Sequence, residues 1–140
     1  MIDVNISKKV IAPFSDNWIK KVVGLVAKEE KKIKGELEII VVGDKEIKRI
    51  NNNSRGKDNI TDVLSFSWKE DTVVNSDVLG EIYICYPQIK RQSKIWEVSE
   101  REEFARMLIH GLLHLVGHDH DNEKKSKKMF DLQEKILEML

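Results

Sequence analysis

The sequence predicts an α+β fold, in which about four strands form a mixed sheet that packs against helices. Short β-branched runs occur among longer segments with helical periodicity. The histidines cluster at the end of one predicted helix and just after it, and we expect this helix to be the central helix and to carry a His-x3-His motif. No internal repeat and no linker rich in Pro, Gly or Ser divides the chain. We therefore expect residues 1–140 to form one domain.

The composition is that of a folded, soluble chain. Hydrophobic residues make up 41% and charged residues 34%, which argues against both a disordered chain and a membrane protein. Lys plus Arg and Asp plus Glu number 24 each, so a nucleic-acid partner would have to bind a local basic patch. The start of the sequence resembles no secretory leader, and Cys85 alone cannot form an internal disulfide. We therefore expect a cytoplasmic protein with no membrane partner.

The first part of the chain is expected to begin with a short strand over residues 4–6. The segment 13–17 contains helix-start signals, so a helix should follow and extend to about Lys31. The β-branched run at 37–42 predicts a largely buried strand. The apolar residues of the helix recur at helical spacing and are Trp18, Ile19, Val22, Val23 and Val26.

The next segment mixes basic and turn-forming residues. Asp44 is a candidate cap for a short basic helix to about Asn51. The Asn-, Gly- and Lys-rich stretch from there to Asn59 is expected to be a loop. Alternating apolar residues predict a strand over 63–68, and a polar loop should extend to Ser76.

The second half is expected to be mostly helical. A fourth strand is predicted over 79–85, and Pro87 marks the start of a helix. The segment 99–102 is a capping box, so a helix should cover the apolar stretch 104–116. A final helix is expected from Asp121 to the C-terminus. Nothing in the sequence sets the order of the strands.

All the histidines lie between His110 and His120. His110 and His114 are at positions i and i+4 of the predicted helix, so their imidazoles should project from one face, as two zinc ligands must. On an uninterrupted helix, His118 would lie roughly 12 Å from His110, which is too far for the same ion. Gly117 can end the helix in the left-handed conformation and turn the chain back. This turn favours His120 over His118 as the third ligand.

A catalytic metal site is one of three interpretations of the histidine cluster. The side chains could instead belong to a polar helix face and a loop, or they could bind a purely structural zinc. Structural zinc sites usually have four protein ligands that include thiolates, whereas Cys85 lies on a predicted strand and is expected in the core. Three histidines leave a coordination position for water, so one catalytic Zn²⁺ per chain is the favoured interpretation. Nickel, copper and iron stay open because they also accept imidazole.

The histidine spacing also matches the metzincin pattern of zinc proteases, except at Gly111. Those enzymes carry a glutamate at this position, and it serves as their general base. Without that carboxylate, the proton transfer of peptide hydrolysis lacks its agent. The sequence therefore favours a different reaction at the same kind of metal site, with a peptide or amide hydrolase kept as an alternative.

The stretch from His110 to His120 closely resembles the signature of the YbeY family of bacterial metal-dependent endoribonucleases. Two further blocks are similar to that family and occur in the same order. The first is Asn51 and Arg55 followed by the segment 61–66, and the second is the segment 79–84. The resemblance covers essentially the whole chain.

The resemblance implies a zinc-dependent, single-strand-specific endoribonuclease of rRNA maturation and ribosome quality control. Its partners would be single-stranded or ribosomal RNA and the ribosome, and no DNA is expected. The resemblance also implies that His110, His114 and His120 bind the metal and that Arg55 is the functionally important basic residue. A guanidinium can bind a phosphate with two parallel hydrogen bonds and neutralise charge at the phosphorus, although a solvated loop arginine is the alternative. For the whole chain, a non-catalytic ribosome assembly factor with a structural metal is a further alternative.

Two positions depart from the family pattern. His118 stands where the family commonly has an aromatic residue, and Ile60 stands where a proline often precedes the Thr-Asp pair. Neither departure removes a predicted ligand, and His118 stays a second candidate for the metal or its surroundings. Thr61 and Asp62 either orient a group of the site or cap the turn before the strand.

Basic and aromatic residues flank the predicted site. Trp18 is expected in the core, whereas Trp68 and Trp96 stay open as residues that stack on bases. The basic residues would form an RNA groove if they converge, and a solvated surface accounts for them equally well. They are Lys45, Lys48, Arg49, Arg55, Lys57, Lys90, Arg91 and Lys94.

Overall fold

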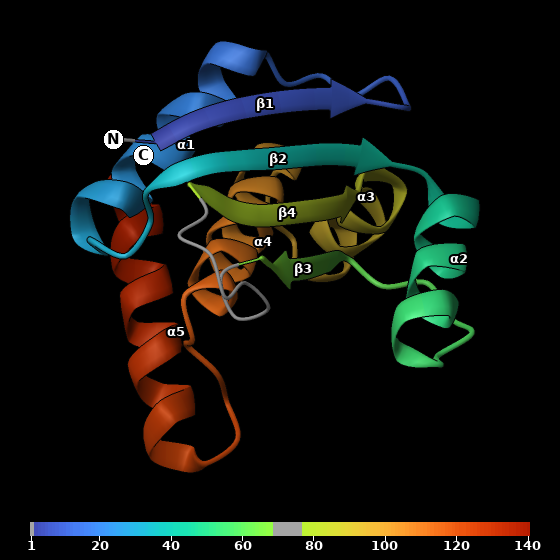
Figure 1. Ribbon diagram of the computed structural model, residues 1–140. Coiled ribbons are helices and arrows are strands. Elements are labelled where there is room, and N and C mark those ends of the chain that lie inside the picture. Colours follow the sequence, from blue (N-terminus) through green and yellow to red (C-terminus); the bar gives the residue numbers. More distant parts are fainter. Residues whose placement is uncertain (1, 69–76) are drawn as a thin grey trace.

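A computed structural model describes residues 2–68 and 77–140, and in this part of the chain a mixed sheet packs against helices (Figure 1). The predicted α+β class is confirmed. The polar loop expected before Ser76 lies outside the described residues. The elements in chain order are β1 (Ile2–Lys8), α1 (Asp16–Glu29), β2 (Gly35–Val42), α2 (Asp44–Arg55), β3 (Val63–Ser67), β4 (Val78–Cys85), α3 (Tyr86–Ile95), α4 (Glu100–Leu115) and α5 (Glu123–Glu138).

The strand order of the sheet is β1-β2-β4-β3. β1 pairs with β2 and β2 pairs with β4 in parallel, whereas β3 runs antiparallel to β4. The two inner strands are rich in β-branched residues, and Ile39 on β2 and Ile82 on β4 are fully buried. Cys85 at the end of β4 is buried too, as expected, and burial raises the pKa of its thiol to about 12. The short strand β3 is left at one edge of the sheet.

The helix α4 is the central helix of the fold and contacts α1, α3, α5, β3 and β4. Phe104, Leu108 and Leu112 lie one turn apart on it and are fully buried. Ser99 caps its N-terminus, because Ser99 Oγ accepts a hydrogen bond from the N–H of Glu102 at 3.0 Å. The predicted capping position is confirmed.

The helix α1 packs against α4 and buries every residue of the apolar stripe predicted for it, Trp18 included. It begins after Ser15, whose Oγ accepts a hydrogen bond from the N–H of Trp18 at 3.1 Å. It ends at Glu29, slightly before the predicted end, because Glu30 is already in an extended conformation.

The helix α2 is longer than predicted. The prediction of a loop that begins at Asn51 was wrong. The helix continues to Arg55 and ends where Gly56 adopts a φ of 66°. Asn51 is buried, and its Nδ2 donates to the backbone oxygen and Oδ1 of Asn59 at 3.1 and 3.0 Å. These hydrogen bonds tie the last part of α2 to the loop that follows it.

Asp44 was expected to cap α2, but Gly43 occupies the cap position. The Asp44 carboxylate instead accepts hydrogen bonds from the Arg91 guanidinium at 3.0 and 2.6 Å. The hydrogen-bonded Arg91 lowers the pKa of Asp44. This ion pair joins the beginning of α2 to the middle of α3.

The chain turns sharply between α4 and α5. Gly117 has a φ of 97°, a conformation that glycine adopts with little strain, as the sequence predicted. α5 starts at Glu123, slightly later than expected, after Asn122 Oδ1 accepts a hydrogen bond from the N–H of Lys125 at 2.9 Å. Within residues 2–68 and 77–140, no helix has the length and apolar character needed to cross a membrane.

Candidate metal centre

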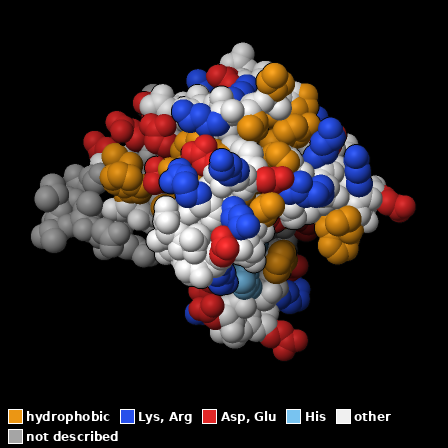
Figure 2. All heavy atoms as spheres, turned by 90° about the vertical axis from the view of Figure 1, so that its right-hand side faces the viewer, with side chains coloured by type: hydrophobic (Ala, Val, Ile, Leu, Met, Phe, Trp, Pro, Cys, Tyr) orange, Lys and Arg blue, Asp and Glu red, His pale blue; other side chains and the backbone are white. Residues whose placement is uncertain are grey.

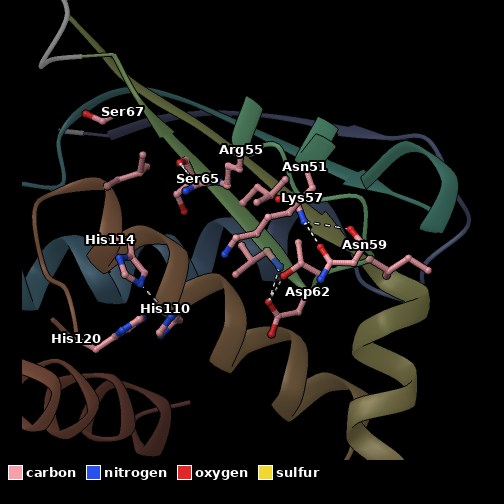
Figure 3. Close-up of a pocket in the computed structure, with 15 residues that line it drawn as sticks. Asn51, Arg55, Lys57, Asn59, Asp62, Ser65, Ser67, His110, His114 and His120 are labelled. Atoms are coloured by element: carbon pink, nitrogen blue, oxygen red, sulfur yellow. Dashed lines mark hydrogen bonds between the residues drawn. The ribbon is translucent and has the colours of Figure 1, made fainter. Parts of the chain in front are cut away.

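The end of α4 and the loop after it bring three histidines together. His110 and His114 project from α4 with their Nε2 atoms 3.1 Å apart. His120 returns from the loop, and one nitrogen from each of the three rings lies within 4.8 Å of the others. Figure 3 shows the three rings grouped on one side of a cleft. The sequence predicted this convergence from the residue spacing and from the turn at Gly117.

His118 points away from this group. Its Nε2 lies 2.8 Å from Oε2 of Glu30, just after α1. The hydrogen bond lowers the pKa of Glu30 and holds the α4–α5 loop against the connection between α1 and β2. Among the described residues, the three-histidine group therefore consists of His110, His114 and His120.

A buried glutamine on α5 orients His110. Gln133 Oε1 lies 2.7 Å from Nδ1 of His110 and is placed to accept the proton of that nitrogen. A proton on Nδ1 leaves the Nε2 lone pair free for a metal ion. The role of Gln133 in the site was not predicted from the sequence. Its position between Met129 and Ile136, on the buried face of α5, could have indicated such a role.

Burial keeps the histidines in the form that binds metals. Burial is the main cause that lowers the pKa of His114 to about 4, and the neighbouring His110 and His120 lower it further. Burial also lowers the pKa of His110, against the hydrogen bond to Gln133. Both imidazoles are therefore neutral at neutral pH.

The donor set fits a zinc-type ion. Two unprotonated imidazole nitrogens that face each other at 3.1 Å repel unless a proton or a cation lies between them. Tetrahedral sites with Zn–N distances near 2.0–2.1 Å place ligand nitrogens about 3.3 Å apart, which is close to the separation of the His110 and His114 nitrogens. The three histidines could therefore hold a metal ion, and imidazoles alone do not select zinc over nickel, copper or iron.

Gly111 lies where α4 is pressed against the sheet. A Cβ atom at this position would meet Ser65 Oγ and Val63 Cγ2, each at 3.0 Å. Ser65 Oγ also donates a hydrogen bond to the Gly111 carbonyl oxygen at 2.9 Å. At the position that holds the general base in zinc proteases, any side chain would therefore press against β3.

The histidines open into a cleft of about 610 Å³ that follows β3. Arg55 and Lys57 line the side across from the histidines (Figure 3). Arg55 Nη2 donates to the Ser65 carbonyl oxygen at 3.1 Å, and the guanidinium carbon lies 5.5 Å from the centroid of the Phe66 ring. The positive charge of Arg55 also lowers the pKa of His114, so the two groups share one electrostatic environment.

Asp62 lies in the same cleft and caps the beginning of β3. Its Oδ1 accepts hydrogen bonds from the Val63 N–H at 2.7 Å and the Thr61 hydroxyl at 3.4 Å. The Asp62 charge also raises the pKa of His110, although burial has the larger, opposite effect. Of the two roles suggested for the Thr61-Asp62 pair, these hydrogen bonds support the cap of the turn before the strand.

Basic residues are numerous on the side of the molecule that carries α2 (Figure 2). Of the basic residues named from the sequence, the cleft is lined by Arg55 and Lys57. Lys48, Arg49 and Arg91 form salt bridges with neighbouring carboxylates. The expected basic groove is thus narrower than the sequence suggested. Trp68 and Trp96 are partly exposed, with 46% and 67% of their surface accessible.

These features define a class of protein, an α+β protein whose central helix and following loop present three histidines to a basic cleft. The chain belongs to the YbeY family, since the family model described as "Endoribonuclease YbeY" matches residues 2–140. The resemblance seen in the sequence is therefore confirmed.

Individual relatives agree with the family model. The chain is 43% identical over 106 residues to the endoribonuclease YbeY of Sulfurihydrogenibium sp., covering 75% of this chain and 70% of the relative. It is 36% identical to the endoribonuclease YbeY of Malacoplasma penetrans over 99% of this chain and 95% of the relative. The solution structure of TM1509 from Thermotoga maritima is similar with a TM-score of 0.66 and 31% identity, over 99% of this chain and 87% of that one.

Proposed function

We propose that this protein is a zinc-dependent endoribonuclease that cleaves single-stranded RNA, and that its substrate is ribosomal RNA during ribosome maturation and quality control. The observation that carries the proposal is one cleft that combines three convergent histidines with Arg55. The relatives named endoribonuclease support the RNA substrate. A ribosomal substrate would place the protein in the cytoplasm, as expected from the sequence.

In this proposal His110, His114 and His120 hold one ion per chain. A zinc ion held there supplies a Lewis acid and makes water a better nucleophile at neutral pH. Gln133 keeps the His110 ring in the required tautomer through its hydrogen bond to Nδ1. Burial lowers the pKa of His110 and His114 and so keeps these two imidazoles free of the additional proton that would compete with the ion.

Arg55 would bind the phosphate that is cleaved. One of its N–H groups is donated to the Ser65 carbonyl oxygen, and the guanidinium has further N–H groups for two parallel bonds to a phosphate. Its charge would then stabilise the negative charge that grows on the phosphoryl oxygens in the transition state. Lys57, also on the cleft wall, would neutralise a neighbouring phosphate.

The packing of Gly111 separates this site from a peptidase. Peptide hydrolysis at a three-histidine site uses a glutamate at this position, whereas this chain has a glycine that is packed closely against β3. In RNA the nucleophile is either water or the 2′-hydroxyl adjacent to the cleaved bond. Substrates with a single 2′-deoxy substitution distinguish these two routes.

The test is cleavage of labelled single-stranded RNA by zinc-loaded protein, with the metal content measured on the same sample. We expect His114→Ala and Arg55→Ala to lose cleavage and Lys94→Ala, a change of an exposed residue outside the cleft, to retain it. Cleavage by His114→Ala and Arg55→Ala at the rate of the unchanged protein would reject the proposal. Casein proteolysis that a chelator abolishes would instead support the peptide hydrolase.

A second candidate function is a non-catalytic ribosome assembly factor with a structural metal. The observation that favours it is that the histidine group ties α4 to the loop leading into α5, while Gln133 braces His110 from α5. Tight ribosome binding without RNA cleavage by the zinc-loaded protein would support this function over the first.

A further inference from the structure

A second groove continues the histidine cleft beyond the end of β3. It has a volume of about 400 Å³ and shares Ser67 and Leu115 with the cleft. Ser67 lies at the opposite end of the cleft from Asn59 (Figure 3). We name it the lysine groove, after a basic side formed by Lys31, Lys32 and Lys34 and an apolar side formed by Leu79, Leu115 and Val116.

The lysine side chains of this groove share one property, which distinguishes them from some but not all other lysines of the protein. Lys31, Lys32 and Lys34 are exposed and form no salt bridge with any residue that the structure describes. On α5, by contrast, Lys127 and Lys135 each pair with a carboxylate, at 2.8 and 3.2 Å. Within the described part of the chain, the groove therefore offers three positive charges to a ligand.

A hydrogen bond fixes these lysines relative to the histidines. Glu30, directly before them, turns inward, where Oε2 contacts Nε2 of His118 at 2.8 Å and Oε1 accepts the N–H of Lys32 at 3.2 Å. His118 belongs to the same loop as His120. The lysine-bearing turn and the histidine-bearing loop are thus held together, although they lie far apart in the sequence.

The chemistry of the groove suits single-stranded nucleic acid. Proteins that bind single strands combine a positively charged groove that follows the backbone with aromatic side chains on which the bases stack. The lysine groove supplies the positive charge, and it adjoins the cleft of Arg55 and the histidines, with which it shares Ser67 and Leu115. A strand that crosses the cleft can therefore continue into the lysine groove.

We propose that the lysine groove binds the phosphodiester backbone of single-stranded RNA on one side of the cleavage position, with Lys31, Lys32 and Lys34 contacting successive phosphates. This inference rests on the proposed function, because it assumes that the cleft receives RNA. It assigns to the protein a substrate path longer than the histidine cleft alone.

The test measures binding of labelled single-stranded RNA of about 16 nucleotides, a length typical of extended single-strand sites. All proteins carry His114→Ala, so that binding is measured without cleavage. The triple change Lys31→Ala, Lys32→Ala and Lys34→Ala should weaken binding about 10- to 100-fold at 0.1 M salt, and the slope of log K against log salt should become shallower by about 2.

The matched control removes the same charge elsewhere. Lys9, Lys20 and Lys94 are exposed, form no salt bridge within the described residues and line neither the cleft nor the groove. Their triple change to alanine should leave both affinity and salt slope nearly unchanged. Equal loss in the two triple variants, or no loss in the groove variant, overturns the inference. An equal effect of the groove variant on duplex RNA of the same length overturns the single-strand assignment.

Cleavage assays separate this inference from the proposed function. With His114 intact, the groove variant should lower kcat/KM for the long RNA and leave it unchanged for RNA of about four nucleotides, which the cleft alone can hold. If the zinc-loaded protein cleaves no RNA but RNA binding still depends on the lysines, the endoribonuclease proposal is rejected and the proposal that the lysine groove binds RNA is kept. If the protein cleaves RNA and the lysine changes alter neither binding nor kcat/KM, the proposal for the lysine groove is rejected and the endoribonuclease proposal is kept.

Discussion

The histidine side of the cleft and the Arg55 side are built by different means. On the histidine side, His110 is braced by the buried Gln133, and α4 is pressed against β3 at Gly111. On the other side, the exposed Arg55 is held by one hydrogen bond to a backbone oxygen and by contact with the Phe66 ring. The comparison shows a rigid wall suited to holding an ion and an adjustable wall suited to receiving a flexible substrate.

Substitutions in the rigid wall should have the largest effect on metal binding and RNA cleavage. We expect His110→Ala and His114→Ala to lose bound zinc and, with it, all detectable RNA cleavage, because two histidines cannot hold a catalytic ion firmly. Metal content by mass spectrometry and a cleavage assay measure both. His118→Ala is the matched control and should keep its zinc, since His118 contacts Glu30 instead. Zinc loss in His118→Ala equal to that in His114→Ala would show that the ligand set is wrong.

A substitution in the adjustable wall should lower the rate of catalysis and leave the amount of bound metal unchanged. We expect Arg55→Ala to lower kcat/KM for RNA about 10²- to 10³-fold, the typical effect of removing a group that stabilises transition-state charge, with zinc content unchanged. Arg55→Lys should recover only part of this loss because it keeps the charge but not the two parallel donors. A variant that loses zinc together with activity would contradict the division between the two walls.

An intermediate effect is expected at Gln133, which touches the metal ligand but not the metal. Gln133→Ala should weaken zinc binding about 10- to 100-fold, as is usual when a hydrogen-bond partner of a ligand is removed. Competition with a zinc chelator measures the change. Restoration of full cleavage by excess zinc would confirm a positioning role, whereas unchanged zinc affinity would show that the His110 ring is held by packing alone.

The smallest effect concerns the packing behind the histidines. Gly111→Ala should lower the free energy of unfolding by about 1–3 kcal/mol, because the added methyl group would overlap Ser65 and Val63. Gly24→Ala is the matched control in α1, where a Cβ meets nothing within 4 Å, and it should stabilise the protein by about 0.5–1 kcal/mol. Denaturant unfolding compares the two. Equal stability of both variants would mean that α4 is not tightly pressed against β3.

Local patterns predicted the parts of the molecule that local interactions determine. The apolar stripe of α1, the cap at Ser99 and the turn at Gly117 each depend on neighbours within a few residues, and the structure shows all three. The approach of His120 to His110 and His114 followed from that turn. The class of the fold and the geometry of the histidines could therefore be predicted from the sequence.

The missed features depend on contacts between distant parts of the chain. The helix α2 continues past Asn51 to Arg55, and Asn51 bonds with Asn59 beyond its end, neither of which is predicted by a stretch of weak helix formers. Gln133 and His110 are 23 residues apart, so no spacing rule links them. The strand order also depends on how the helices pack over the sheet. These features could be found only once the fold was known.

The hydrogen bond from Arg55 to Ser65 has a consequence for association between molecules. In the antiparallel pairing of β3 with β4, Asp62 and Trp68 form backbone hydrogen bonds with β4, so the odd-numbered residues between them direct their polar groups outward. The Asp62 carboxylate accepts a hydrogen bond from the outward N–H of Val63, and the Arg55 guanidinium donates one to the outward carbonyl oxygen of Ser65. Loss of Arg55 would therefore free part of a sheet edge to which a strand of another molecule can add, and we expect Arg55→Ala to self-associate more readily in light-scattering measurements.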